Sequence, residues 1–248
     1  MEYMPIGVII NALSVLIGGL AGAALGNKIP EHLRGNLTLI FGLASCSMGI
    51  ATIVKINALP AVVFAVIIGI AIGELIRLEK GIAVGAKAFE KPISALFSNK
   101  TTLNPDEYME KLIGIIVLFA ASGTGIFGAL ESGLTGDNTI LITKSILDLF
   151  TAAIFATSLG FIVSMVAIPQ FVVLILLFLS ATFIMPLTNA SMLADFSACG
   201  GILMFATGMR ICGIKIFPVG NMIPAMVLVM PFSNLWTSHV VPVLKALL

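Results

Sequence analysis

Phe205-Ala206-Thr207-Gly208-Met209-Arg210-Ile211-Cys212-Gly213 places an arginine among small, helix-weakening residues inside a long apolar run. Two related stretches precede it, Ala44-Ser45-Cys46-Ser47-Met48-Gly49-Ile50 and Ala121-Ser122-Gly123-Thr124-Gly125-Ile126-Phe127-Gly128. The second of these matches the last stretch in register. Both contain Ala, then Ser or Thr, then Gly, and further on Ile and Gly at the same positions. Each stretch is followed, after a short polar link, by another apolar run. The sequence therefore predicts three helical hairpins, related by weak internal repeats, whose helices are interrupted at these stretches.

The composition around these stretches is that of an integral membrane protein. The chain has 248 residues, of which 59% are hydrophobic and 10% charged, and its mean hydropathy is +1.14. A helix that spans a membrane needs about 20 mostly apolar residues, because every backbone donor and acceptor must be satisfied inside the hydrocarbon. We expect one all-α, polytopic membrane helix bundle over residues 1–248, with about eight transmembrane helices and seven as the alternative. The formal charge of +1 gives no reason to expect nucleic acid as a partner.

Sequence signals of catalysis or metal binding are missing. The two histidines are isolated, and the sequence holds no HExxH, GxSxG or P-loop pattern. The three cysteines have unrelated spacings, which argues against a disulfide framework and a metal site. Residues 123–128 match GxGxxG, but they lie inside an uncharged apolar run rather than after a strand, so a nucleotide role is not expected. We expect no enzyme activity, no cofactor and no metal.

The first apolar run, residues 5–25, carries a ladder of glycines. No Lys or Arg precedes this run, so it should remain in the protein as a spanning helix rather than be cleaved as a signal peptide. Gly18, Gly22 and Gly26 recur every fourth residue on one helix face, where they allow another helix to approach closely. That partner could lie in the same chain or in a homo-oligomer. Asn11, on the same helix, either links helices or lines a path.

Residues 77–111 form a basic segment between the third and fourth predicted spans. Of the 13 basic residues, six lie between Glu74 and Lys111. Short loops rich in Lys and Arg stay in the cytoplasm, so we expect a cytoplasmic, partly amphipathic segment here and the N-terminus on the outer side. A helix start is expected at Asn104, which Pro105 and Glu107 follow at capping positions.

Residues 149–194 contain no charged side chain. This length is enough for two spans, and Pro169-Gln170 is the predicted turn between them. A single broken span with a re-entrant piece is the alternative that would reduce the total to seven.

Two charged residues stand within or beside predicted spans. If its helix starts near Thr139, Asp148 lies about 13 Å along it, near the middle of a membrane. Asp148 could pair with Lys144, four residues earlier, bind a cation or proton, or act as an interfacial cap. Arg210 could extend to the cytoplasmic interface or, if the helix unwinds near Thr207 and Gly208, face an anionic solute.

These observations favour a transporter or channel for a small solute or ion. The predicted path is lined by the three small-residue stretches, with Asn11 and Asp148 as polar ligands. Its residues are Asn11, Ser45, Ser47, Ser122, Gly123, Thr124, Asp148, Thr207, Gly208 and Arg210. The alternative is a membrane scaffold or sensor that does not transport and that presents its basic cytoplasmic segment to a partner.

The chain also resembles a known family. Gly7-Val8-Ile9-Ile10-Asn11-Ala12 before the glycine ladder, Leu39-Ile40-Phe41-Gly42 before Met48-Gly49-Ile50, and the residues from Gly69 to Glu74 are similar to the YdfK/YqgA-type family. These are bacterial multi-pass inner-membrane proteins of unknown function. The resemblance implies a polytopic all-α protein in the inner membrane, often labelled a possible transporter, and it brings no substrate and no catalytic residues.

Overall fold

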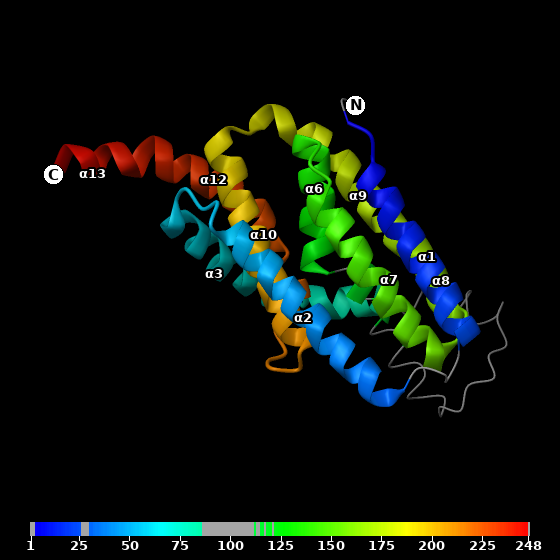
Figure 1. Cartoon of the computed structure of the whole chain (residues 1–248). Coiled ribbons are helices and arrows are strands. Elements are labelled where there is room, and N and C mark those ends of the chain that lie inside the picture. Colours follow the sequence, from blue (N-terminus) through cyan, green and yellow to red (C-terminus); the bar gives the residue numbers. More distant parts are fainter. Residues whose placement is uncertain are drawn as a thin grey trace.

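The computed structural model describes residues 3–25, 30–85, 112, 115, 116, 118–120 and 122–247. Every regular element in this described part is helical, and the long helices run alongside one another as a bundle (Figure 1). The all-α prediction is confirmed. The elements are α1 (Ile6–Leu25), α2 (Glu31–Ile53), α3 (Leu59–Leu75), α6 (Gly123–Thr135), α7 (Thr139–Leu159), α8 (Ile162–Met165), α9 (Ala167–Ile184), η2 (Met185–Leu187), α10 (Ala190–Ile211), α11 (Val219–Met222), α12 (Pro224–Leu235), η3 (Trp236–Val240) and α13 (Val241–Leu247).

Six helices in the described residues are long and apolar enough to cross a membrane. A seventh candidate is the pair Leu59–Leu75 and Leu78–Gly85, which is bent by 58°. The predicted fourth span, residues 112–130, includes residues outside the described part and is not in this number. Most of the basic segment, with its predicted helix start at Asn104, also lies outside the described residues. The structure confirms a polytopic helical bundle.

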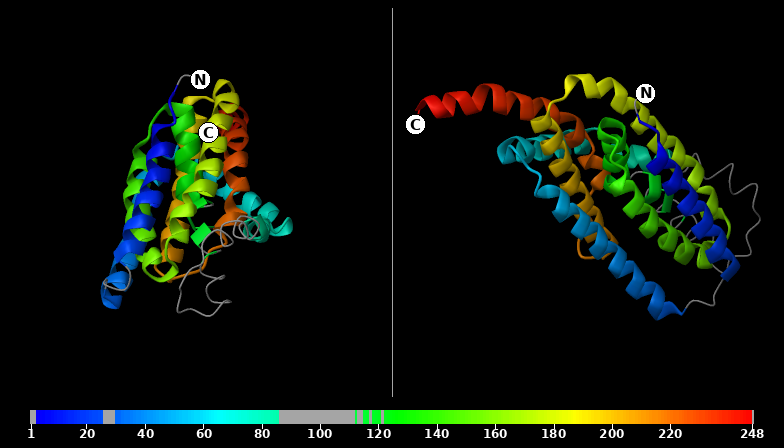
Figure 2. Two further views of the ribbon diagram at one scale, coloured as in Figure 1. Left: turned by 90° about the vertical axis from the view of Figure 1, so that its right-hand side faces the viewer. Right: turned by 45° about the horizontal axis from the view of Figure 1, so that its top comes forward.

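Helices far apart in the sequence pair closely at glycines. A Cβ atom on Gly18 would lie 2.1 Å from the carbonyl oxygen of Leu149, and one on Gly22 would lie 2.0 Å from that of Ala153. Gly18 and Gly22 of the glycine ladder therefore pack against α7 of the same chain. This is the first of the two predicted alternatives, a partner helix within the chain. Elsewhere α3 packs along α11 and α12, and α6 along α9, as the two views in Figure 2 show.

The helix is continuous through the first small-residue stretch, in α2, and through the third as far as Ile211, where α10 ends. The prediction that they interrupt their helices is wrong. The two stretches pack against each other instead: a Cβ on Gly208 would lie 2.5 Å from Sγ of Cys46, and one on Gly49 would lie 2.7 Å from the backbone nitrogen of Phe205. Small residues here serve close packing, which drives helix association in lipid, rather than exposure of the backbone.

The second stretch does interrupt the helical chain. Ser122 has an extended backbone, with φ −72° and ψ 142°, and its hydroxyl accepts a hydrogen bond from the amide of Gly125. Helix α6 begins at the next residue, Gly123. Serine is favoured at this position because its short side chain satisfies one of the amides that a helix start leaves without a partner.

The turn within the uncharged stretch lies earlier than predicted. Helix α7 ends at Leu159, and Gly160, with φ 76°, starts the turn into α8. Glycine adopts this left-handed region without steric cost. Pro169 and Gln170 instead lie in the first turn of α9, where a proline is tolerated because its missing N–H would have no helical partner there. The predicted turn at Pro169-Gln170 is therefore wrong.

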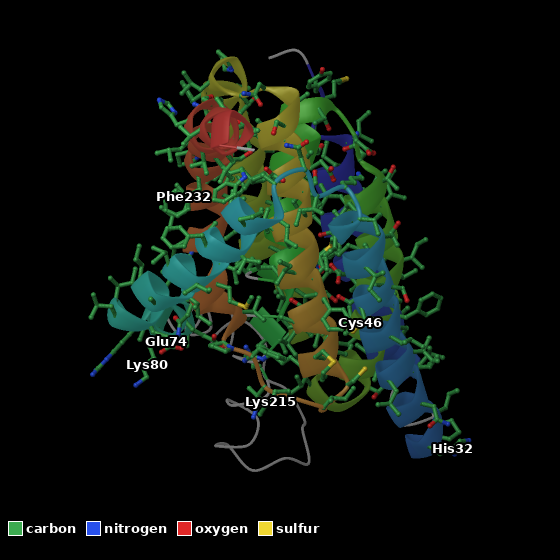
Figure 3. All side chains as sticks on the ribbon, turned by 90° about the vertical axis from the view of Figure 1, so that its left-hand side faces the viewer. His32, Cys46, Glu74, Lys80, Lys215 and Phe232 are labelled. Carbon is green, nitrogen blue, oxygen red and sulfur yellow. The ribbon has the colours of Figure 1, made fainter. Side chains whose placement is uncertain are left out.

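The links between helices divide between the two ends of the bundle. Lys55, in the α2–α3 link, forms an ion pair with Glu131 near the end of α6, and Asn138, in the α6–α7 link, accepts a hydrogen bond from the amide of Gly7. The α10–α11 link is at the opposite end, where Lys215 lies toward the same side as His32 (Figure 3).

Candidate functional site

A cavity of about 300 Å³ lies between α2, α6, α7, α10 and α11. This volume is at the lower end of the range of small-molecule sites and far above the roughly 10–15 Å³ that holds one water. Polar and apolar side chains share its wall. The lining residues are Phe41, Ser45, Leu118, Ser122, Thr124, Lys144, Leu147, Asp148, Thr151, Phe155, Thr207, Arg210, Ile211, Val219 and Gly220.

Most of the predicted path residues meet in this cavity. Each of the three small-residue stretches contributes to its wall, although they lie far apart in the sequence. The predicted residues that line it are Ser45, Ser122, Thr124, Asp148, Thr207 and Arg210.

Three other predicted residues, Asn11, Ser47 and Gly208, do not line the cavity. Asn11 lies behind Asp148 and is fully buried, and Gly123 is the first residue of α6. Ser47 lies on the exposed side of α2, where its hydroxyl donates to the carbonyl of Leu43. Gly208 forms part of the contact between α10 and α2. Ser47 and Gly208 each lie on a different face of their helix from the neighbouring residues that line the cavity.

Asp148 is the centre of a buried polar cluster. Its Oδ2 accepts hydrogen bonds from Nδ2 of Asn11 at 2.8 Å and from Nε2 of Gln170 at 3.0 Å, and it forms an ion pair with Nζ of Lys144. The amide of Gln170 also donates to the side-chain oxygen of Asn11 at 2.7 Å. Helix α7 begins at Thr139, the start that places Asp148 about 13 Å along the helix. The expected Lys144–Asp148 pair is confirmed, and it lies inside the bundle rather than at an interface.

Arg210 is held at the edge of the cavity. Its Nη1 forms an ion pair with Oε1 of Glu79 at 2.6 Å and also donates to the carbonyl oxygen of Phe217 at 3.2 Å. Arg210 is the second-last residue of α10, a helix end at which a positive charge is favourable. The side chain therefore turns to a partner and to the cavity rather than only extending to an interface.

The described wall of the cavity carries the hydroxyl groups of Ser45, Ser122, Thr124, Thr151 and Thr207. Those of Ser45 and Thr207 donate to backbone carbonyls, of Met204 and Leu203 respectively. No hydrogen bond joins the hydroxyl of Thr124 to a described residue, although Thr124 is only 4% exposed. It faces the cavity from the second residue of α6.

Gln170 and Glu79 are the important residues that sequence reasoning missed. Gln170 is fully buried and bonds to Asp148, but in the sequence it was assigned to a turn because it follows a proline. A polar residue in a long uncharged stretch is a signal that could have found it. Glu79 lies in a segment rich in charge, where nothing in the sequence distinguishes it from its neighbours.

Asp195 has a structural role at the other end of the bundle. Its Oδ1 accepts hydrogen bonds from the backbone amides of Asn57 at 2.8 Å and Ala58 at 2.7 Å, just before α3 begins, and its Oδ2 accepts one from Ser233 at 2.6 Å. The carboxylate thus holds the α2–α3 link and α12 onto α10. It does not line the cavity.

The bundle, its buried charges and the polar cavity define a polytopic helical membrane protein. The chain belongs to the family described as "Protein of unknown function (DUF554)", whose model matches residues 6–234. It is 50% identical to "Uncharacterized protein YqgA" of Escherichia coli (strain K12) over 235 aligned residues. The alignment covers 95% of this chain and 99% of that protein. It is 26% identical over 228 residues to "Uncharacterized membrane protein YdfK" of Bacillus subtilis (strain 168), covering 90% and 93%. No solved structure matches. The predicted family is confirmed.

Proposed function

We propose that this protein is a transporter or channel of the bacterial inner membrane that moves a small solute or ion through the central cavity, without enzymatic chemistry. The observation that carries the proposal is the convergence of the three small-residue stretches on one cavity. Charged groups inside a membrane bundle are costly, and where they occur they commonly face a substrate or ion pathway.

The surroundings of the cavity support this role. Asp148 lies about 13 Å from the start of α7, whereas Arg210 is almost at the end of α10 that joins the α10–α11 link. The cavity therefore extends from the interior of the bundle toward that link. The helical chain is broken beside the cavity, at Ser122. Broken helices expose backbone groups to a solute in many transporters.

Flux through purified protein in liposomes tests the proposal. Uptake of small cations, inorganic anions, carboxylates and amino acids is measured for the wild type, for Asp148→Asn and Arg210→Gln, and for Ser47→Ala as the control outside the cavity. We expect saturable uptake of one solute class, reduced at least tenfold in Asp148→Asn or Arg210→Gln and unchanged in Ser47→Ala. Absence of uptake for every solute, with all variants folded, would contradict the proposal and favour a scaffold that does not transport.

A further inference from the structure

We infer that the cavity binds a small organic monocarboxylate, whose carboxylate group is held at the start of α6 and by Arg210. This inference rests on the proposed function in taking the cavity as the solute site, and it adds the class of solute. It follows from the hydrogen-bonding capacity of the wall, the break before α6 and the apolar part of the wall.

The wall has more free donors than free acceptors. Among the described lining residues, Lys144 and Arg210 are positively charged and Asp148 is negatively charged, while Glu79 pairs with Arg210 from outside the wall. An ammonium group has three donors and a guanidinium five, and neither can accept a hydrogen bond. Each therefore keeps donors beyond the bonds that it makes to Asp148, Glu79 and Phe217.

One carboxylate oxygen of the wall is fully engaged. Oδ2 of Asp148 already receives Asn11, Lys144 and Gln170. A cation in the cavity would have to compete with Lys144 for this carboxylate. An anion would compete with Asp148 for Lys144 and with Glu79 for Arg210, but both cations keep further donors that it could use.

The start of α6 adds donors at a fixed position. The amide of Gly125 is satisfied by Ser122, but no described residue accepts from the amides of Gly123 and Thr124. The start of a helix carries a partial positive charge of about half a unit, and its free amides bind anions well. The hydroxyl of Thr124, a residue that is only 4% exposed, has no described partner and faces the same space. It is an independent indication that a ligand belongs there, since buried polar groups are normally hydrogen-bonded.

Arg210 supplies the second half of the carboxylate site. A guanidinium binds a carboxylate through two parallel hydrogen bonds, and only Nη1 is engaged by Glu79 and Phe217. Glu79 does not line the cavity, so it holds the guanidinium from behind. It also competes with a ligand for the charge of Arg210.

The rest of the wall indicates an organic anion rather than an inorganic one. Large apolar side chains from several elements face the cavity, and an inorganic ion would leave them against water. Small-molecule sites commonly combine such walls with a few polar groups that fix orientation. The apolar residues of the wall are Phe41, Leu118, Leu147, Phe155, Ile211 and Val219.

Ligand-induced thermal stabilisation of the full-length protein in detergent tests the inference. Pyruvate, which is ionised at neutral pH, is the probe, and pyruvamide is the matched neutral control. Potassium chloride at equal ionic strength controls for inorganic anions. A ligand that binds only the folded state raises the melting temperature as its concentration exceeds its dissociation constant. We expect saturable stabilisation by pyruvate and none by pyruvamide.

Variants identify the site. Thr124→Val, which keeps the shape of the side chain, should weaken pyruvate binding about tenfold, and Arg210→Gln should weaken it further. Glu79→Gln should strengthen binding several-fold, because it removes the competing carboxylate. Thr143→Val is the matched control, since the hydroxyl of Thr143 donates to the carbonyl of Thr139 and lies outside the cavity.

The outcomes separate this inference from the proposed function. Equal stabilisation by pyruvate and pyruvamide, equal stabilisation by chloride, or an unchanged affinity in Thr124→Val would overturn the inference. Cation uptake that pyruvate does not inhibit would also overturn it, while leaving a transporter. Pyruvate binding at the cavity, with no uptake of any solute by liposomes, would retain the carboxylate site and contradict transport.

Discussion

Lys144 and Asp148 form an ion pair, and this pairing allows two charged side chains to lie in the interior of the bundle. Both side chains are buried, at 4% and 9% exposed. Taking two ions out of water costs several kcal/mol each, and their attraction offsets this cost only when hydrogen bonds satisfy the remaining atoms. Asn11 and Gln170 supply such bonds to Asp148. The cluster is therefore a unit, in which each member depends on the others.

This unit predicts a large loss of stability for Asp148→Asn. The substitution leaves the ammonium of Lys144 buried without its counter-ion, which costs about 3–5 kcal/mol. Thermal unfolding in detergent should show a clearly lower melting temperature. The double variant Lys144→Met with Asp148→Asn removes both charges and should recover most of the loss. If the losses of stability in the single variants Asp148→Asn and Lys144→Met simply add in the double variant, the two residues do not act as a pair.

At the scale of residues, the sequence predicted what local spacing determines. Lys144 and Asp148 are four apart on one helix face, so their pairing could be expected from the sequence. The bonds from Asn11 and Gln170 to Asp148 join residues that are 137 and 22 positions away, and Glu79 is 131 positions from Arg210. Such contacts depend on how whole helices pack, which no local pattern encodes.

At the scale of helices, small residues determine how closely neighbours approach. Gly22→Ala should be strongly destabilising, because the added Cβ would lie 2.0 Å from the carbonyl oxygen of Ala153, and backbone cannot move aside cheaply. Gly35→Ala is the matched control: Gly35 is also helical and has nothing within 4 Å of its Cβ position. Alanine favours helix over glycine by about 1 kcal/mol, so this control should be neutral or slightly stabilising. Equal melting temperatures for the two variants would contradict the packing of α1 against α7.

The small-residue stretches show why element boundaries were harder to predict than elements. Glycine weakens a helix in water, but it also lets two membrane helices touch, and a single sequence does not say which effect prevails. Contact prevails at Gly208 and Gly49, where α10 meets α2, and interruption prevails at Ser122, where a cap is available. The turn at Gly160 was missed because Pro169, a stronger breaker in the interior of a helix, falls where α9 accepts it.

For the molecule as a whole, composition and hydropathy were sufficient to predict an all-α membrane bundle. Backbone satisfaction in hydrocarbon permits few other architectures for such a sequence. The predicted cavity residues also largely meet, because the three stretches that supply them lie on α2, α6 and α10, which surround one space with α7. The internal repeat and the orientation in the membrane stay predictions.

Blocking the cavity with a reagent attached at one lining position tests most directly whether the cavity is the path of the solute. Uptake by liposomes is measured before and after a charged thiol reagent, in Ser45→Cys and Ser47→Cys variants whose native cysteines are replaced by alanine. The two serines are two residues apart on the same helix and so lie on nearly opposite faces: Ser45 lines the cavity and Ser47 lies on the exposed side. The account predicts that the reagent abolishes uptake in Ser45→Cys and leaves it intact in Ser47→Cys. Modification of Ser45→Cys with no loss of uptake would contradict it.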